Sequence, residues 1–271
     1  MSEMGMKKRW NNIFESDGKA FILAMDHAAV TRAGQKTIKD PGKVIKEVID
    51  GGADAVFTTC GVASAYPDAF GNAGLLLRVD IGTTEKHPSG KFFQNVLETA
   101  SVEDALKLGA DGILCMGFTH QEDEPEFLAR VSRLSAKCRE WGVVLGVEVM
   151  PGGFPGAPEG LHTAEEIGFT ARAFAEQGAD FIKAPYTGSV EEYKKNVVDC
   201  CYRPILVLGG GESRTDECLL QMVHDSVEAG CKGVMIGRAV FEHQNVTGIT
   251  KAICGILHKG WSVEEALKTM D

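Results

Sequence analysis

A chain of 271 residues, of which 44% are hydrophobic and 24% charged, has the length of a single (β/α)8 barrel and an ordinary globular composition. Its 28 Lys and Arg residues are outnumbered by 38 Asp and Glu residues, and the net charge of -10 argues against nucleic acid or an anionic membrane as a partner. No stretch approaches the roughly 20 apolar residues of a membrane span. We therefore expect one large domain rather than two small ones.

The first residues and the cysteines both favour a cytoplasmic setting. The basic residues Lys7, Lys8 and Arg9 lie in a start, Met1 to Trp10, that is followed by two asparagines rather than by an apolar run, so we expect no signal peptide. The eight cysteines form no Cys-x-x-Cys pair, and several lie in apolar segments that suit buried thiols. We expect reduced cysteines and no structural metal.

Short apolar or β-branched runs alternate with helical patterns, as in a parallel sheet whose strands are joined by helices. We predict an α/β fold, a single (β/α)8 TIM barrel over residues 1–271, with residues 1–19 as an N-terminal extension. The eight predicted strands are Ala20–Ala28, Ala53–Gly61, Leu75–Gly82, Gly112–Phe118, Val143–Met150, Phe181–Tyr186, Pro204–Gly211 and Gly233–Phe241.

Helical patterns are clearest in the second half of the chain. Thr83–Gly90, in contrast, is predicted to be a long loop, which at the active face of a barrel usually carries function. The predicted helices are Glu124–Trp141, Thr163–Gln177, Val190–Cys201, Thr215–Ala229, Val246–His258 and a C-terminal helix within residues 261–271, capped by Ser262 and ending at Met270.

A weak internal repeat supports this architecture. The tripeptide Gly-Ala-Asp precedes the second, fourth and sixth predicted strands, at Gly52–Asp54, Gly109–Asp111 and Gly178–Asp180. A glycine that ends a helix before a short polar turn is ordinary chemistry for such connections, so the repeat indicates architecture rather than a site.

Polar residues cluster where a barrel places its active site, at the carboxyl ends of strands that are otherwise apolar. Metal ligands are not among the expected roles, because the remaining histidines, among them His87, His120 and His162, lie on loops without ligand spacing. The clustered residues are Asp26, His27, Arg78, Asp80, Glu148, Lys183 and Arg238.

Lys183 is the only charged residue of its predicted strand, Phe181–Tyr186. Burial disfavours the charged form of a lysine, and the neutral amine is the form that attacks a carbonyl. A structural ion pair with Asp26 or Glu148 is the alternative role. The surrounding polar residues favour the nucleophile.

Two carboxylates are candidates for acid–base catalysis beside Lys183. Glu148 lies on the fifth predicted strand, where strand alternation places it on the same face as Met150. Asp26 ends the first strand and can act as a base or orient a substrate hydroxyl. His27 is expected on the opposite side of that strand, in a supporting or substrate-contacting role. Arg78 and Asp80 are further possible substrate contacts.

Two glycine turns indicate a phosphate site. Gly209 and Gly210 follow the seventh strand, and Gly237 and Arg238 follow the eighth. Glycines let backbone amides approach an anion, and the loops after these two strands form the common phosphate site of such barrels. Arg238 adds a positive charge and a fork of donors.

Asp26, Lys183, Gly209, Gly210 and the Gly237–Arg238 pair resemble the motifs of archaeal-type class I fructose-bisphosphate aldolases, over nearly the whole chain. The group also includes a dideoxy-heptulosonate synthase and a thiolase that degrades a phosphorylated quorum signal. The resemblance implies a Schiff-base lysine, an active-site aspartate and a phosphate clamp. It further implies a homo-oligomer and a role in carbohydrate metabolism such as glycolysis.

One position departs from the family pattern. Archaeal fructose-bisphosphate aldolases have a tyrosine proton donor on strand five where this chain has Met150, which cannot transfer a proton. Glu148 matches a tryptophan of the family and is our candidate for the missing acid–base role.

The predicted reaction is reversible cleavage of a phosphorylated ketose, fructose-bisphosphate-like, to dihydroxyacetone phosphate and an aldehyde. Because the protonated imine acts as the electron sink, no cofactor is expected. The alternatives are heptulosonate synthesis, thiolase-type acyl transfer and a barrel that binds phosphosugars without catalysis. We expect the loops Thr83–Gly90 and Gly152–Leu161 to determine which aldehyde is used.

Overall fold

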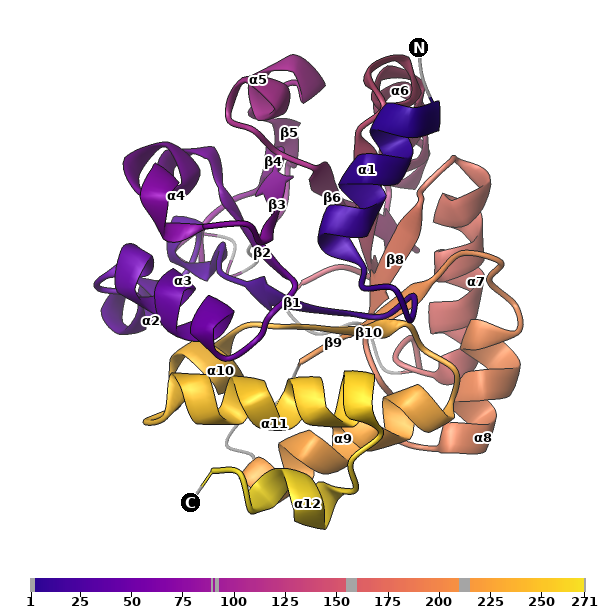
Figure 1. The fold of residues 1–271 in the computed structure, drawn as a ribbon. Helices are drawn as coiled ribbons and strands as arrows, with labels where there is room; N and C mark the ends of the chain where they lie inside the picture. Colours follow the sequence, from indigo (N-terminus) through magenta and orange to yellow (C-terminus); the bar gives the residue numbers. More distant parts are fainter. Residues whose placement is uncertain (1–2, 89, 91–92, 155–159, 210–214, 271) are drawn as a thin grey trace.

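The computed structural model describes residues 3–88, 90, 93–154, 160–209 and 215–270, and it contains a closed barrel of parallel strands surrounded by helices (Figure 1). This confirms the predicted fold class. The order around the barrel is β1-β10-β9-β8-β7-β6-β3-β2. The strands are β1 (Ala20–Ala24), β2 (Ala55–Thr59), β3 (Gly74–Arg78), β6 (Gly112–Thr119), β7 (Val144–Pro151), β8 (Phe181–Ala184), β9 (Ile205–Leu208) and β10 (Gly233–Ile236).

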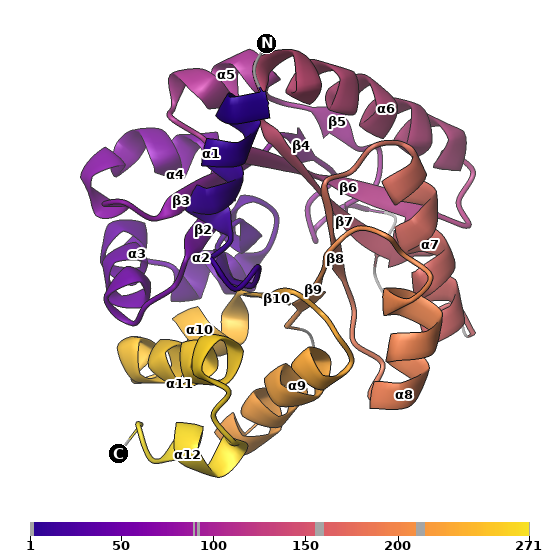
Figure 2. The same cartoon turned by 45° about the vertical axis from the view of Figure 1, so that its right-hand side comes forward.

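Helices form an outer layer around the strands (Figure 2). The longer ones match the predicted helices to within about two residues, because their caps are visible in the sequence. The helices are α1 (Glu3–Ile13), α2 (Arg32–Thr37), α3 (Pro41–Asp50), α4 (Cys60–Ala65), α5 (Val102–Lys107), α6 (Glu124–Trp141), α7 (Ala164–Glu176), α8 (Val190–Tyr193), α9 (Asp216–Glu228), α10 (Arg238–Phe241), α11 (Val246–Lys259) and α12 (Val263–Leu267), with η1 (His27–Ala29), η2 (Pro67–Ala69) and a π-helical turn, η3 (Lys194–Val198), after α8.

Most predicted strands extend too far at their carboxyl ends. The first strand stops at Ala24, and residues 27–29 form a 3-10 helix instead. The eighth stops at Ile236, and Arg238 begins α10. The apolar runs continue past the hydrogen-bonded ladder because the loops that follow also pack over the barrel, so hydrophobicity alone does not mark the end of a strand.

The third βα unit is irregular in a second way. After β3 the chain forms β4 (Asp80–Ile81), which pairs antiparallel with β5 (Leu97–Glu98) outside the barrel. The connection between β4 and β5 includes the predicted loop Thr83–Gly90, of which residue 89 lies outside the described residues.

The Gly-Ala-Asp repeat has a structural role at the helix-to-strand turns. Its glycines adopt positive φ just after the ends of α3, α5 and α7, a conformation that favours glycine. The aspartates join neighbouring strands by accepting backbone hydrogen bonds. Asp54 accepts from Phe21 N, Asp111 from Leu75 N and Asp180 from Leu145 N, at 2.6, 3.0 and 2.9 Å.

Helix α1 closes the amino-terminal end of the barrel. Ile13 and Phe14 are buried together with inward-facing strand residues such as Ile22, Leu76 and Phe181. Because side chains fill the barrel at this end, the space that the strands enclose opens toward their carboxyl ends.

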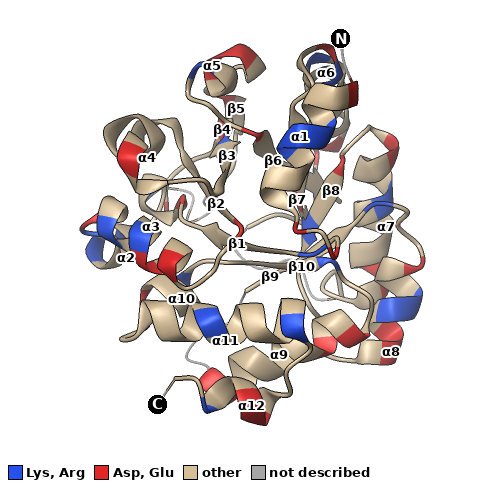
Figure 3. Cartoon of the chain, in the orientation of Figure 1, with Lys and Arg blue, Asp and Glu red and all other residues tan. Residues whose placement is uncertain are grey.

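Acidic and basic residues are mixed along the outer helices, with Lys and Arg on several of them (Figure 3). Within the part of the chain that the structure describes, none of the helices is long and apolar enough to cross a membrane. All eight cysteines are free thiols.

Candidate active site

A cavity of about 580 Å³ lies at the carboxyl ends of the barrel strands. Its wall brings together six of the seven polar residues that the sequence singled out: Asp26, His27, Arg78, Glu148, Lys183 and Arg238. They come from β1, β3, β7, β8 and β10 or the residues just after them. The predicted gathering of polar groups at this end of the barrel is therefore present.

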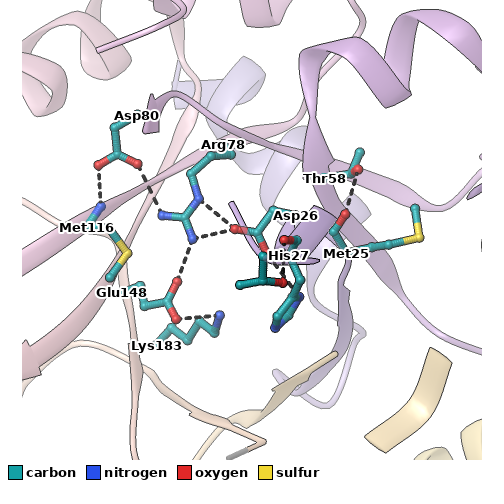
Figure 4. Close-up of polar contacts among 10 residues, drawn as sticks. Met25, Asp26, His27, Thr58, Arg78, Asp80, Met116, Glu148 and Lys183 are labelled. Carbon is teal, nitrogen blue, oxygen red and sulfur yellow. Dashed lines mark hydrogen bonds and ion pairs between the residues drawn. The ribbon is translucent and has the colours of Figure 1, made fainter. Parts of the chain in front are cut away.

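Lys183 forms a close ion pair with Glu148. The two residues are register partners on the neighbouring strands β7 and β8, and Lys183 Nζ lies 2.8 Å from Glu148 Oε1 (Figure 4). Lys183 is 4% exposed and Glu148 7% exposed, so the pair is almost removed from solvent. The ion pair considered from the sequence is thus real, and it places a proton acceptor on the candidate nucleophile.

Arg78 connects both candidate acid–base carboxylates. Its Nη2 lies 2.7 Å from Glu148 Oε2 and 2.8 Å from Asp26 Oδ2, and its Nε donates to the same Asp26 oxygen at 2.9 Å (Figure 4). Its Nη1 lies 3.2 Å from Asp80 Oδ1. The guanidinium carbon also lies 4.9 Å from the ring centroid of Phe57 and 5.4 Å from that of Phe93. These contacts hold the guanidinium in one position.

The positive charges keep two buried carboxyls ionised. Burial raises the pKa of Asp26, but the charges of Arg78, His27 and Lys183 and the hydrogen bond from Arg78 together outweigh burial, and the pKa lies well below its ordinary value. The pKa of Glu148 is also lowered, because Lys183 and Arg78 outweigh the opposing effect of burial. For Asp80 burial dominates and raises the pKa.

His27 lies in the cavity, contrary to its expected position on the opposite side of the first strand. Because β1 ends at Ala24 and the chain turns into η1, strand alternation no longer applies at this residue. Its Nδ1 lies 3.6 Å from Asp26 Oδ1. Burial lowers the pKa of the imidazole despite the nearby Asp26 charge, which favours the neutral ring.

The residues predicted to bind phosphate lie at the β9 and β10 side of the cavity. Gly209, Gly237 and Arg238 all line it, and Gly210 lies outside the described residues. A Cβ at Gly237 would come within 2.5 Å of Ala24 O and of the His27 ring, so this close approach requires glycine.

The sequence of the chain matches a known enzyme family over most of its length. The family model of the DeoC/LacD family aldolases covers residues 20–243, which include every residue of the cavity wall. The chain belongs to the DeoC/LacD aldolase family. Aldolase chemistry, predicted from the sequence, is thereby confirmed at the level of the family.

Relatives of two kinds support this membership. A 2-amino-3,7-dideoxy-D-threo-hept-6-ulosonate synthase of Halobacterium salinarum is 32% identical over 268 residues, which is 98% of this chain and 97% of the relative. An archaeal fructose 1,6-bisphosphate aldolase superposes with a TM-score of 0.83 at 26% identity, over 94% of this chain and 100% of the other. A Schiff-base-forming fructose-1,6-bisphosphate aldolase superposes with a TM-score of 0.82 at 27% identity, over 93% of this chain and 100% of the other.

In this family member Asp80 lies beneath the cavity. It is fully buried and accepts a hydrogen bond from Met116 N at 2.7 Å, and it is not among the residues that line the cavity. The possible substrate contact predicted for Asp80 is thus replaced by a contact with Arg78.

Several residues that line the cavity were not singled out from the sequence. Phe93, Phe154 and the exposed His162 come from loops, and Met116 comes from β6. An aromatic residue in a loop gives no periodic signal, so only the folded chain places Phe93 and Phe154 against the site. Met150, the expected departure from the family tyrosine, also lines the cavity.

Proposed function

We propose that this protein is a class I aldolase in which Lys183 forms a Schiff base with a phosphorylated ketose and cleaves it reversibly to dihydroxyacetone phosphate and an aldehyde. The proposal is carried by one observation: a nearly buried lysine at a cavity wall, with its Nζ 2.8 Å from a carboxylate that is itself held by an arginine. Such a group has its proton acceptor already in place for attack on a carbonyl.

Imine formation uses Lys183 and Glu148. Because the pKa of Glu148 is lowered, its carboxylate is ionised near neutral pH and can accept a proton from the attacking amine. The protonated Glu148 then returns a proton to the hydroxyl of the carbinolamine, which leaves as water. The resulting iminium withdraws electrons from the neighbouring carbon. Glu148 thereby takes the acid–base role that Met150 cannot fill.

Carbon–carbon cleavage uses Asp26. A base must accept the proton of the substrate hydroxyl as the bond breaks, and Asp26 is an ionised carboxylate on the cavity wall. Arg78 holds the Asp26 carboxylate through two nitrogens, which fixes its orientation. No cofactor is needed for this step, because the iminium is the electron sink.

The phosphate of the ketose is proposed to bind at Gly209, Gly237 and Arg238. Arg238 is exposed at the end of β10, and β10 lies two strands from β8, which carries Lys183, in the barrel order. One small molecule can therefore place its carbonyl at Lys183 and its phosphate at Arg238. The guanidinium of Arg238 supplies charge and paired donors.

The identity of the ketose is the finer part of the proposal. A fructose-bisphosphate-like substrate is supported by the likeness to solved aldolases with that activity. Heptulosonate synthesis is a second candidate, because the 32% identical relative carries that name. For either substrate, the proposed mechanism uses Lys183 as the Schiff-base lysine.

Reductive trapping tests the proposed mechanism. Borohydride added to the protein with dihydroxyacetone phosphate should reduce the imine and attach one substrate to the peptide that contains Lys183, as seen by mass spectrometry. Lys183→Met should abolish the adduct, and Lys268→Met, at an exposed ion-paired lysine, should not. A wild-type protein that yields no adduct, or that transfers acetyl groups to coenzyme A instead, would overturn the proposal.

A cytoplasmic setting and a homo-oligomer also belong to the proposal. The eight unpaired cysteines support a reducing compartment. Light scattering of the purified chain tests the oligomer.

A further inference from the structure

The cavity wall across the barrel from Arg238 is apolar. Strand β6 lies four places from β10 in the closed order, so it faces the proposed phosphate site. On this side the cavity is lined by Met116 and Met150, from β6 and β7, and by the loop residues Phe93 and Phe154. A ketose joined to Lys183 on β8, with its phosphate toward β10, directs its other end at this wall.

The apolar wall is held by packing behind it. Phe118, fully buried, lies 6.5 Å from Phe93 and 5.9 Å from Phe154 between ring centroids, and those two rings lie 6.2 Å apart. Phe93 also has a φ of 55°, unusual for a residue with a side chain, and its N–H donates to Thr83 O at 2.7 Å. Backbone strain of this kind is often found where a side chain must be placed for function.

The charges on this side disfavour a second phosphate. Arg78 already contacts three carboxylates, whose negative charges oppose the approach of a further anion. In the described part of this wall the other basic group is His162, which is exposed to solvent.

We infer that the aldehyde handled by this enzyme carries an apolar, unphosphorylated substituent, such as a short alkyl chain, and that Phe93, Met150 and Phe154 determine this specificity. The inference rests on the proposed Schiff-base function, and it replaces the fructose-bisphosphate-like ketose with one that carries a single phosphate. The ketose is then phosphorylated at one end and apolar at the other, unlike a bisphosphate.

In the synthetic direction the reaction is balanced without a further reactant. The iminium of Lys183 and dihydroxyacetone phosphate loses a proton from the adjacent carbon to become an enamine. The enamine attacks the aldehyde carbon, a carbon–carbon bond forms, and the aldehyde oxygen takes up a proton in place of the one released. Water then hydrolyses the iminium, which releases the ketose and restores the amine. The water lost in forming the imine equals the water consumed here.

A comparison of kcat/KM among aldehydes tests the proposed specificity for an apolar substituent. With dihydroxyacetone phosphate as the donor, we expect kcat/KM to rise about fourfold per methylene from acetaldehyde to butyraldehyde, as burial of each methylene predicts. Butyraldehyde should exceed glyceraldehyde 3-phosphate at least roughly tenfold. An equal or higher kcat/KM for glyceraldehyde 3-phosphate, or no rise with chain length, would overturn the inference.

Substitutions in the apolar wall test whether its side chains determine the aldehyde preference. Met150→Gln and Phe154→Gln should each lower kcat/KM for butyraldehyde about tenfold, while Met150→Leu should retain it. Met4→Gln and Phe169→Gln, at exposed positions on α1 and α7, are the matched controls and should change nothing. Unaltered butyraldehyde use by both wall variants would refute the assignment.

Borohydride trapping with dihydroxyacetone phosphate, run on every variant, separates the two proposals. An adduct at Lys183 together with a preference for the phosphorylated aldehyde overturns the specificity alone. A wild-type protein without any adduct overturns the proposed function and this inference with it. Variants that retain the adduct have kept the folded donor site, so their changed aldehyde use is assigned to the wall.

Discussion

Nη2 of Arg78 lies 2.7 Å from Oε2 of Glu148, and the other oxygen of that carboxylate lies 2.8 Å from Lys183 Nζ. The same Arg78 nitrogen lies 2.8 Å from Asp26. One guanidinium therefore holds both proposed acid–base groups and, through Glu148, acts on the proposed nucleophile. Arg78 is best described as a positioning residue whose charge keeps two carboxyls ionised.

Arg78→Lys should move the acid limb of the pH–rate profile to higher pH. The pKa values of Asp26 and Glu148 are lowered in part by Arg78, so the ionised forms now persist below their ordinary range. The ammonium of a lysine cannot reach all three carboxylates, so the pKa values of Asp26 and Glu148 should both rise. As pH is lowered, the variant should therefore lose activity earlier, at a higher pH than the wild type. The measurement is kcat/KM against pH.

Arg133→Lys, at an exposed ion pair with Glu126, provides the control for Arg78→Lys and should leave the profile unchanged. A lower kcat/KM in Arg78→Lys with the same acid limb would mean that Arg78 has a structural role only.

Glu148→Gln should slow imine formation by about 10²–10⁴-fold, the usual contribution of a general acid–base group. Glutamine retains the volume and one acceptor for Arg78, but it cannot take the proton of Lys183. The rate of borohydride-trappable adduct formation measures this step directly. A change of less than about threefold would assign the acid–base role elsewhere.

Arg238→Gln should weaken binding of phosphorylated donors specifically. Loss of a hydrogen bond to a charged group costs about 1.5–3 kcal/mol, or roughly 10- to 100-fold in KM for dihydroxyacetone phosphate. The rate with unphosphorylated dihydroxyacetone should be unchanged, because that donor has no phosphate to contact. An equal loss with both donors would place the phosphate elsewhere in the cavity.

The sequence was sufficient to place Lys183 and Glu148 together, because a charge in an apolar strand is visible without a structure and parallel strands bring such residues to one edge. The contacts of Arg78 were not predictable. These contacts depend on how far the Arg78 side chain extends inside the closed barrel toward residues of other strands. His27 was misplaced because its position depends on where β1 ends. Phe93 lies in a loop, and no local sequence pattern predicts its left-handed backbone conformation.

His258→Gln should reduce stability more at low pH than at high pH. Nδ1 of His258 lies 3.0 Å from Asp17, and Nε2 lies 3.1 Å from Asp54. Burial lowers the pKa of His258, but the two aspartates outweigh burial and raise it above the ordinary 6.5. Because the pKa of His258 is higher in the folded than in the unfolded state, its protonated ring stabilises the folded protein fully below about pH 6.5. This stabilisation is lost as the pH rises through the folded-state pKa.

Urea unfolding at pH 6 and at pH 9 measures this effect. We expect His258→Gln to lose about 1–2 kcal/mol of unfolding free energy at pH 6 and less at pH 9. His162→Gln, at an exposed histidine, should show no such difference. A loss in His258→Gln that does not depend on pH would indicate that packing rather than charge is responsible.

Phe14→Ala should destabilise the protein without altering its chemistry. Phe14 is 3% exposed, stacks on Trp10 with a centroid distance of 4.2 Å and meets Phe181 edge-on at 5.8 Å. Removing a buried phenyl ring costs about 3–5 kcal/mol of unfolding free energy, whereas Leu97→Ala, at an exposed residue, should cost little.

The enzymatic readout of Phe14→Ala tests whether the two ends of the barrel are independent. Phe181, which packs against Phe14, lies two residues before Lys183 on β8. If the packed interior isolates the cavity from the closed end, kcat/KM measured well below the melting temperature should match that of the wild type. A change in kcat/KM would show that displacement of Phe181 is transmitted along β8 to the Lys183–Glu148 pair, since a shift of about 1 Å in a reacting group can cost about 100-fold in rate.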